Sequence, residues 1–187
     1  VISGTTDHAD GSSVYRIKSG PNGQPITIDS TKVVDGSFEL KGSLDQIDIN
    51  FIFLDGINGN VPVILEEGSI DINIFKDSIA SSIIAGTPSN NNLAQYREST
   101  QGFAKDMRTL GQEINEANTL GDNILAEDLT AEYKAVEANL NVYERDFMNS
   151  NPQSYVASLI LERLVITKVM RCLLYTSDAA DDSLRVD

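Results

Sequence analysis

Cysteine, histidine and tryptophan are almost absent from this chain. Its 187 residues include one cysteine, one histidine and no tryptophan. A structural zinc site takes about four Cys or His ligands, so the chain cannot supply one. A disulfide needs two cysteines, so no internal disulfide can hold the fold together.

Basic residues and long apolar runs are also scarce. The chain has 14 Lys and Arg against 28 Asp and Glu, which gives a net charge of −14. So acidic a chain repels phosphate backbones, which argues against nucleic-acid binding. No apolar run reaches the roughly 20 residues of a membrane-spanning helix, so we predict no transmembrane segment. The hydrophobic content of 41% still allows a buried core.

The single cysteine lies in a segment with an unusual sequence. Residues 172–182 read Cys-Leu-Leu-Tyr-Thr-Ser-Asp-Ala-Ala-Asp-Asp, which resembles the in-frame translation of a sequencing adapter. The alternative is a genuine acidic tail. We favour the adapter and leave residues 172–187 out of the fold reasoning. We then expect the natural protein to continue beyond Arg171 and to begin before Val1, which is neither a methionine nor part of an apolar signal segment.

Apolar and polar residues alternate in the first half of the chain, and this period of two predicts strands with one buried face. Turn signals separate the runs at intervals of roughly 8–12 residues, which is typical of a sandwich or barrel. Residues 26–42 predict a hairpin around Asp35 and Gly36. Pro62 lacks an N–H, so we expect its strand to lie at an edge of the sheet or to start there. The alternating runs are residues 14–18, 26–29, 47–53, 61–65 and 70–74.

The period changes to that of a helix near residue 87. Gly121 lies in a break between two helical stripes, which predicts an antiparallel helical hairpin. Asn151 and Pro152 offer a cap and a first-turn proline for a third helix that runs from Ser154 towards Met170. The first stripe is Leu93, Tyr96, Thr100, Phe103, Met107, Leu110, Ile114 and Ala117; the second is Leu125, Leu129, Tyr133, Val136, Leu140, Tyr143 and Phe147.

The predicted fold class is therefore α+β. An antiparallel β-sandwich over residues 1–86 precedes a helical segment over residues 87–171, and residues 172–187 form the adapter-like tail.

Few residues are candidates for a catalytic or metal-binding role. His8 lies between Asp7 and Asp10, but a solvated turn explains it better than a metal site, because no second histidine is present. Residues 55–60 carry several oxygen ligands for calcium, yet Asn and Gly are also what a hairpin loop requires. We predict no catalytic, cofactor-binding or metal-ligating residue.

Two further candidates are carboxylates and a hydroxyl. Glu66 and Glu67 are adjacent, and on a strand they would point to opposite faces, which argues against a shared acid–base role. Ser30 beside Asp29 has only His8 as a general base and lacks a nucleophile elbow. The aromatic side chains of the helical stripes could line a groove for a ligand, but packing between the two helices explains the same spacing.

An ordered series of short motifs runs along the chain. The series covers nearly all of residues 1–171. Its members are Ile2-Ser3-Gly4, Val14-Tyr15-Arg16-Ile17, Asp29-Ser30-Thr31, Gly36-Ser37-Phe38-Glu39-Leu40-Lys41-Gly42, Leu65-Glu66-Glu67-Gly68, Ile70-Asp71-Ile72, Gly86-Thr87, Asn90, Leu93-Ala94-Gln95-Tyr96 and Asn151-Pro152-Gln153-Ser154.

This series resembles a known family, the domain of unknown function that precedes a thioredoxin-like domain in cell-envelope proteins of Bacteroidetes. The resemblance implies a non-catalytic accessory domain of a truncated thiol–disulfide oxidoreductase. The expected location is the cell envelope, either periplasmic or lipid-anchored. The expected partners are the missing thioredoxin-like domain and client proteins, and the third helix, with Leu159, Leu164 and Val165, is the expected contact with that domain. A stand-alone surface module that binds peptides or glycans is the alternative; the lack of tryptophan speaks against glycan stacking. A hydrolase has little support.

Overall fold

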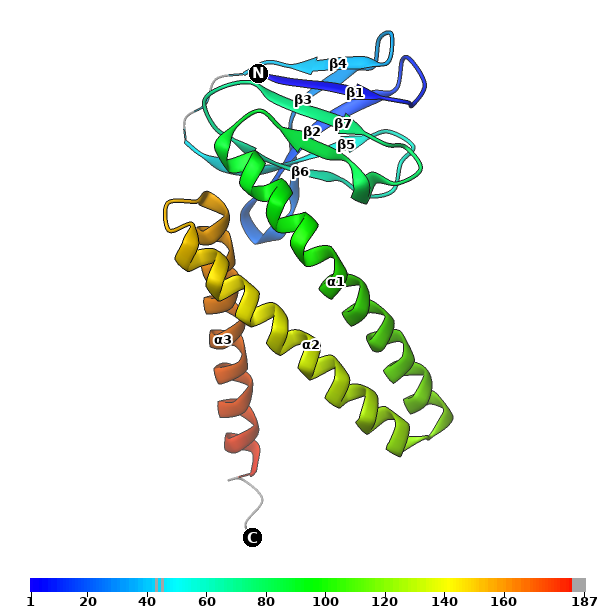
Figure 1. The fold of residues 1–187 in the computed structure, drawn as a ribbon, viewed down its shortest axis with the longest axis vertical. Helices are drawn as coiled ribbons and strands as arrows, with labels where there is room; N and C mark the ends of the chain where they lie inside the picture. Colours follow the sequence, from blue (N-terminus) through cyan, green and yellow to red (C-terminus); the bar gives the residue numbers. More distant parts are fainter. Residues whose placement is uncertain (43, 45, 183–187) are drawn as a thin grey trace. The chain divides into compact units, whose positions relative to one another are not determined.

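The computed structural model describes residues 1–42, 44 and 46–182, with side chains up to residue 168. The chain divides into two compact units, Val1–Ser99 and Thr100–Asp187. The division falls inside helix α1 (Pro88–Leu120), so the first turns of this helix belong to the first unit (Figure 1).

The first unit is a sandwich of two four-stranded sheets, which confirms the predicted α+β class with strands before helices. One sheet has the strand order β4-β1-β7-β8, and the other has the order β3-β2-β5-β6. The strands are β1 (Ile2–Thr6), β2 (Ser13–Ser19), β3 (Pro25–Lys32), β4 (Ser37–Leu40), β5 (Asp48–Leu54), β6 (Val61–Leu65), β7 (Ile70–Ile74) and β8 (Ile83–Ala85).

The alternation of apolar residues decides which face of each strand is buried. In β7, Ile70, Ile72 and Ile74 are buried, whereas Asp71 is exposed. In β5, Ile52 is buried in the same way. Side chains of this kind from both sheets fill the core of the sandwich. Pro62 lies on β6, an edge strand, as its missing N–H predicts.

The predicted hairpin over residues 26–42 is wrong. Its turn exists: Asp35 and Gly36 both have positive φ, and Val34 and Ser37 form an isolated bridge around them. However, β3 pairs with β2 and β4 pairs with β1, so the two runs belong to different sheets. Val33 is buried where the chain leaves β3. The crossing lets β4 bury Phe38 and Leu40 in the core, which a flat two-stranded hairpin could not do.

One strand pair departs from the antiparallel pattern. Strands β1 and β7 run parallel, with Ile2 opposite Ile70 and Thr6 opposite Ile74. They are the two central strands of their sheet. Parallel neighbours need a long connection, and here the chain builds the whole second sheet between them.

The second unit contains the rest of α1 together with α2 (Asn123–Ser150) and α3 (Tyr155–Asp182). Both predicted stripes are the more buried faces of their helices, and Phe103 of α1 contacts Tyr143 of α2 with ring centroids 6.5 Å apart. Leu125 is an exception: it is exposed, and Ala126 is buried in its place. Residues 172–182 continue α3, and residues 183–187 lie outside the described part; the adapter origin of this tail stays a prediction.

The ends of the helices are fixed by side chains. Asp122 caps α2 by accepting a hydrogen bond from the Leu125 N–H at 3.1 Å. The predicted cap of α3 is wrong. Asn151 ends α2, because its N–H and its side-chain amide both donate to the Phe147 carbonyl. Ser154 takes the cap position instead, and its Oγ accepts a hydrogen bond from the Val156 N–H at 3.2 Å.

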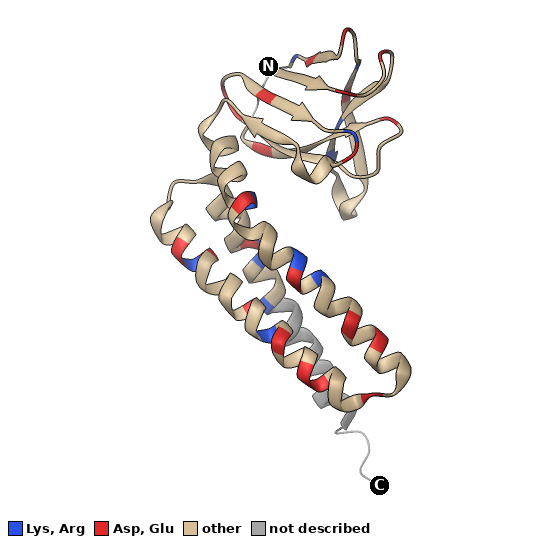
Figure 2. Cartoon of the chain, turned by 45° about the vertical axis from the view of Figure 1, so that its right-hand side comes forward, with Lys and Arg blue, Asp and Glu red and all other residues tan. Residues whose placement is uncertain are grey.

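Acidic side chains are spread along α1 and α2, as Figure 2 shows. This distribution over exposed helix surface fits the role of charge in solubility. Within the described residues, none of the helices combines the length and apolar character that crossing a bilayer requires.

Candidate functional site

His8, the only histidine in the sequence, contacts the loop of residues 55–60, which has the oxygen ligands of a possible calcium site. His8 Nε2 lies 3.0 Å from the carbonyl oxygen of Asp55, the first residue of the loop. The loop joins β5 and β6, which pair antiparallel, so the hairpin interpretation is confirmed. Gly56 and Gly59 have positive φ, as such a turn requires. The contact uses a backbone oxygen, so it ties the loop to the chain after β1.

The carboxylates beside His8 hold backbone amides. Asp7 Oδ1 accepts from the Lys76 N–H at 2.9 Å, and Asp10 Oδ1 accepts from the Gly36 N–H at 3.0 Å. Among the described residues, no group of three or more His, Cys, Asp or Glu side chains is arranged to hold a metal ion. These aspartates therefore act as turn-stabilising acceptors.

Ser30 lies on β3, opposite Tyr15 of β2. Its N–H donates to Asp29 Oδ1 at 2.8 Å, a local contact that occupies the carboxylate. The His8 ring lies against the Asp55 carbonyl instead. A nucleophile needs its base within hydrogen-bond reach, and the described contacts do not pair Ser30 with His8.

The two adjacent glutamates follow β6, in the turn before β7. Glu66 accepts hydrogen bonds from the N–H and the Oγ of Ser89, at 2.7 and 2.8 Å. Ser89 is in the first turn of α1. A carboxylate there satisfies free N–H groups and complements the positive end of the helix dipole. Glu66 therefore fixes the start of α1.

Asn90 is a buried polar residue whose side-chain amide is hydrogen-bonded through both its oxygen and its nitrogen. Its Oδ1 accepts from the Ile64 N–H at 2.9 Å, and its Nδ2 donates to the Ile64 carbonyl at 2.7 Å. The amide thus pairs with the free edge of β6 as a neighbouring strand would. Sequence reasoning took Asn90 only as a motif residue. Its position just before the helical stripe was the one available signal.

The aromatic residues of the helical stripes lie against one another. The ring centroids of Tyr143 and Phe147 are 6.3 Å apart, and Phe103 packs on Tyr143 from α1. Such distances are those of packed aromatic pairs. The packing interpretation of these three residues is therefore confirmed.

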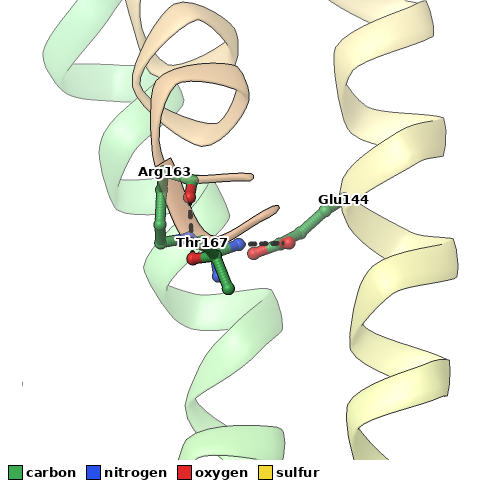
Figure 3. Close-up of polar contacts among 3 residues, drawn as sticks. All are labelled: Glu144, Arg163 and Thr167. Atoms are coloured by element: carbon green, nitrogen blue, oxygen red, sulfur yellow. Dashed lines mark hydrogen bonds and ion pairs between the residues drawn. The ribbon is translucent and has the colours of Figure 1, made fainter. Parts of the chain in front are cut away.

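A buried carboxylate lies among these helices, and the sequence pattern did not reveal it. Glu144 of α2 is only 1% exposed and forms an ion pair with Arg163 of α3, which is half exposed (Figure 3). Thr167 donates to the Arg163 carbonyl at 2.8 Å, one turn further along α3. The pair links α2 to α3, and a charged residue one position after Tyr143 gives no periodic signal that it is buried.

Among the concavities on the described part of the first unit, two have a defined lining. One, of about 360 Å³, lies over the sheet that contains β1 and is lined by residues such as Ser3, Asp71 and Asn73. The other, of about 330 Å³, lies at the end of the sandwich where β1 and β7 begin. Arg16 lines the second pocket, and its Nε is buried without a hydrogen-bond partner. This pocket is the candidate site, because concavities with a few placed polar groups are where ligands bind.

The comparisons with known proteins bear on the first half of the chain. Residues 1–93 match the model of a family described as a domain of unknown function (DUF4369). The match includes the strands and the first turn of α1, but not the motif at residues 151–154. No curated protein and no solved structure matched the chain.

Proposed function

We propose that this chain is a non-catalytic accessory region of a cell-envelope thiol–disulfide oxidoreductase, whose redox chemistry resides in a thioredoxin-like domain further along the parent protein. The observation that carries the proposal is the ordered motif series, whose members up to Leu93 fall inside the family match. In the parent enzyme a thiolate would attack a disulfide and a second cysteine would resolve the intermediate.

The arrangement of the candidate residues supports a non-catalytic role. His8, Ser30 and Glu66 are each engaged with backbone or capping partners. General acid–base and nucleophilic chemistry need such groups to converge, and these three do not share contacts. The region would position the redox domain or help to select its clients.

The exposed face of α3 supports a contact with another domain. Val165 is 52% exposed, and Leu161 and Ile166 are exposed to a similar degree. Leu159 and Leu164, which the sequence assigned to the same contact, are partly buried. Of the expected contact residues, Val165 therefore fits best, and its exposed neighbours extend the apolar surface.

Sequencing the source DNA across the codon for Arg171 tests the proposal. A reading frame that continues into a thioredoxin-like domain with a Cys-x-x-Cys motif is the expected result. A stop codon directly after Asp187 would contradict both the adapter interpretation and the oxidoreductase parent. As a control on the chain itself, insulin reduction by the purified protein should not exceed that of buffer with dithiothreitol alone.

A stand-alone binding module for peptides is the second candidate. The pocket that Arg16 lines favours it, because a guanidinium with a buried, unpartnered Nε is a specific recognition group for an acidic ligand. Binding by the purified chain to a peptide array, together with the stop codon described above, would make this function the better one.

A further inference from the structure

The pocket at the end of the sandwich has aliphatic walls. It lies where β1 and β7 begin and where β4 and β6 end, and its volume is about 330 Å³. This is near the lower limit for small-molecule sites, so the pocket suits a short group. The aliphatic side chains that line it include Val1, Ile2, Leu40, Leu44, Leu65 and Ile70.

Arg16 brings a positive charge into these walls from the inner face of β2. Val14, two residues earlier on the same face, is 0% exposed. Arg16 is paired with Ile52 of β5, which is also 0% exposed. Because opposite residues of paired strands share a face, Arg16 occupies a position between the sheets that aliphatic residues otherwise fill.

The guanidinium has no counter-ion among the described residues. Its Nε is buried and lacks any hydrogen-bond partner. Glu66, which also lines the pocket, is held by two hydrogen bonds from Ser89. Lys41, another residue of the wall, pairs with Glu39 at 3.2 Å. Glu67 also lines the pocket but forms no ion pair with Arg16.

Gly42 leaves space beside the charge. A Cβ at Gly42 would lie 3.6 Å from one terminal nitrogen of Arg16, so the guanidinium passes close to this backbone. Any larger side chain at this position would project towards the charged group.

The buried Nε of Arg16 is an N–H donor without a partner, and leaving such a donor unsatisfied costs folding free energy. A carboxylate matches the planar fork of a guanidinium and removes that cost. We propose that this pocket binds a carboxylate carried on a short aliphatic group. Such a ligand is either the C-terminal aliphatic residue of a peptide or a short fatty acid.

This inference goes beyond the accessory role and is independent of it. It rests on Arg16 and the pocket walls, whereas the proposed function rests on the motif series and the parent gene. Either one can fail without the other.

The first experiment is an NMR titration of the ¹⁵N-labelled chain with sodium hexanoate, with 1-hexanol as the uncharged match. Hexanoate should cause saturable shifts of the Arg16, Gly42 and Gly68 amides. Hexanol should bind about tenfold more weakly, because it cannot form the charge-assisted pair. The proposal would be overturned if both probes bind equally well. It would also be overturned if hexanoate causes no saturable shift up to about 20 mM, a concentration at which even a weak ligand should bind.

Variants at two positions of β2 assign the effect to one cation. Arg16→Met should abolish the shifts, and Arg16→Lys, which keeps the charge and the inner-face position, should weaken binding several-fold. Lys18→Met, on the same strand but not lining the pocket, should bind hexanoate as the unmodified chain does. If Arg16→Met does not fold, Arg16→Lys carries the test. Unchanged affinity in Arg16→Lys together with loss in Lys18→Met would contradict the assignment.

The source of the carboxylate is decided by a second pair of probes. Acetyl-Gly-Gly-Leu with a free carboxylate is compared with the same peptide as its C-terminal amide. Tighter binding of the free peptide than of hexanoate supports a peptide end, and the reverse order supports a fatty acid. Equal affinity of the free and amidated peptides, without hexanoate binding, would overturn the proposal.

Discussion

The two units of the chain bury their apolar side chains to different degrees. In the sandwich, Ile52, Val63 and Ile64 are completely buried. Along the helices of the second unit, stripe residues such as Met107 and Ile114 remain partly exposed. A strand in a sandwich has a second sheet over its inner face, whereas a helix shields its neighbour along one stripe only. The difference teaches that equally clear apolar periodicity can produce cores of unequal depth.

Large-to-small substitutions should make this contrast most visible. Ile52→Ala should destabilise the sandwich by about 4 kcal/mol, because it leaves a cavity in a packed interior. Ile114→Ala in α1 should cost only about 1 kcal/mol, because its side chain is already partly in water. Hydrogen exchange of β5 and α1 amides measures both. Similar losses of amide protection from exchange in the two variants would contradict the inference that the sandwich core is packed more deeply than the helical unit.

In the first unit, the loss of a buried hydrogen-bonding side chain should also lower the stability strongly. Asn90→Leu should cost about 3 kcal/mol, because the Ile64 N–H and carbonyl both lose their buried partner. Gln95→Leu, on an exposed position of the same helix, is the matched control and should have little effect. Urea unfolding followed by exchange of the β6 amides gives the difference. A cost for Asn90→Leu no larger than for Gln95→Leu would show that the edge of β6 needs no partner.

In the second unit the comparable polar contact should matter less. Arg163→Met should cost about 2 kcal/mol, because it leaves the Glu144 charge buried while the exposed half of Arg163 is already solvated. Glu144→Leu combined with Arg163→Met should recover most of this loss. The control is Arg145→Met on the exposed face of α2. Thermal unfolding of the unmodified chain, the two single variants and the double variant is the measurement. A double variant that is less stable than Arg163→Met would contradict the view that an uncompensated Glu144 charge causes the loss.

The smallest effect is expected at the turn between α1 and α2. Asp122→Ala removes the side-chain acceptor for the Leu125 N–H and should cost about 1 kcal/mol. Asp128→Ala, exposed within α2, is the control for the lost charge. Circular dichroism during urea unfolding compares them. Equal midpoints for the two variants would mean that this cap is not needed to start α2.

Local patterns predicted the elements well. The alternation at residues 61–65 and 70–74 matches β6 and β7 at both ends, and the stripe around Phe103 identified the buried side of α1. Each of these patterns is a property of one short segment. Periodicity therefore carries enough information to place an element and to choose its buried face.

Pairing between distant segments could not be predicted in the same way. The turn at Asp35 and Gly36 looked like a hairpin, but whether its flanks pair depends on what else lies beside them. The parallel pairing of β1 with β7 likewise leaves no mark on either strand. These features arise from competition among strands for partners and core space, which a single segment does not record.

The candidate site was missed for a related reason. Arg16 alternates with Tyr15 and Ile17 in a strand-like pattern, and an arginine in such a run is usually on the solvent face. Only the pairing of Arg16 with Ile52 reveals that it lies on the inner face. The one hint in the sequence was the apolar residue Val14, two positions earlier and so on the same side of the strand. The structure shows that Val14 is buried.

The parallel pair of β1 and β7 has a consequence for how the protein is made. During synthesis β1 leaves the ribosome first, but its central partner is complete only when Ile74 has emerged. Until then β1 can pair only with β4 on its other side, and the loop that must close to bring β7 beside β1 is long. The sandwich is therefore expected to complete its folding only after Ile74 has been made, and until then one edge of β1 stays unpaired in the nascent chain.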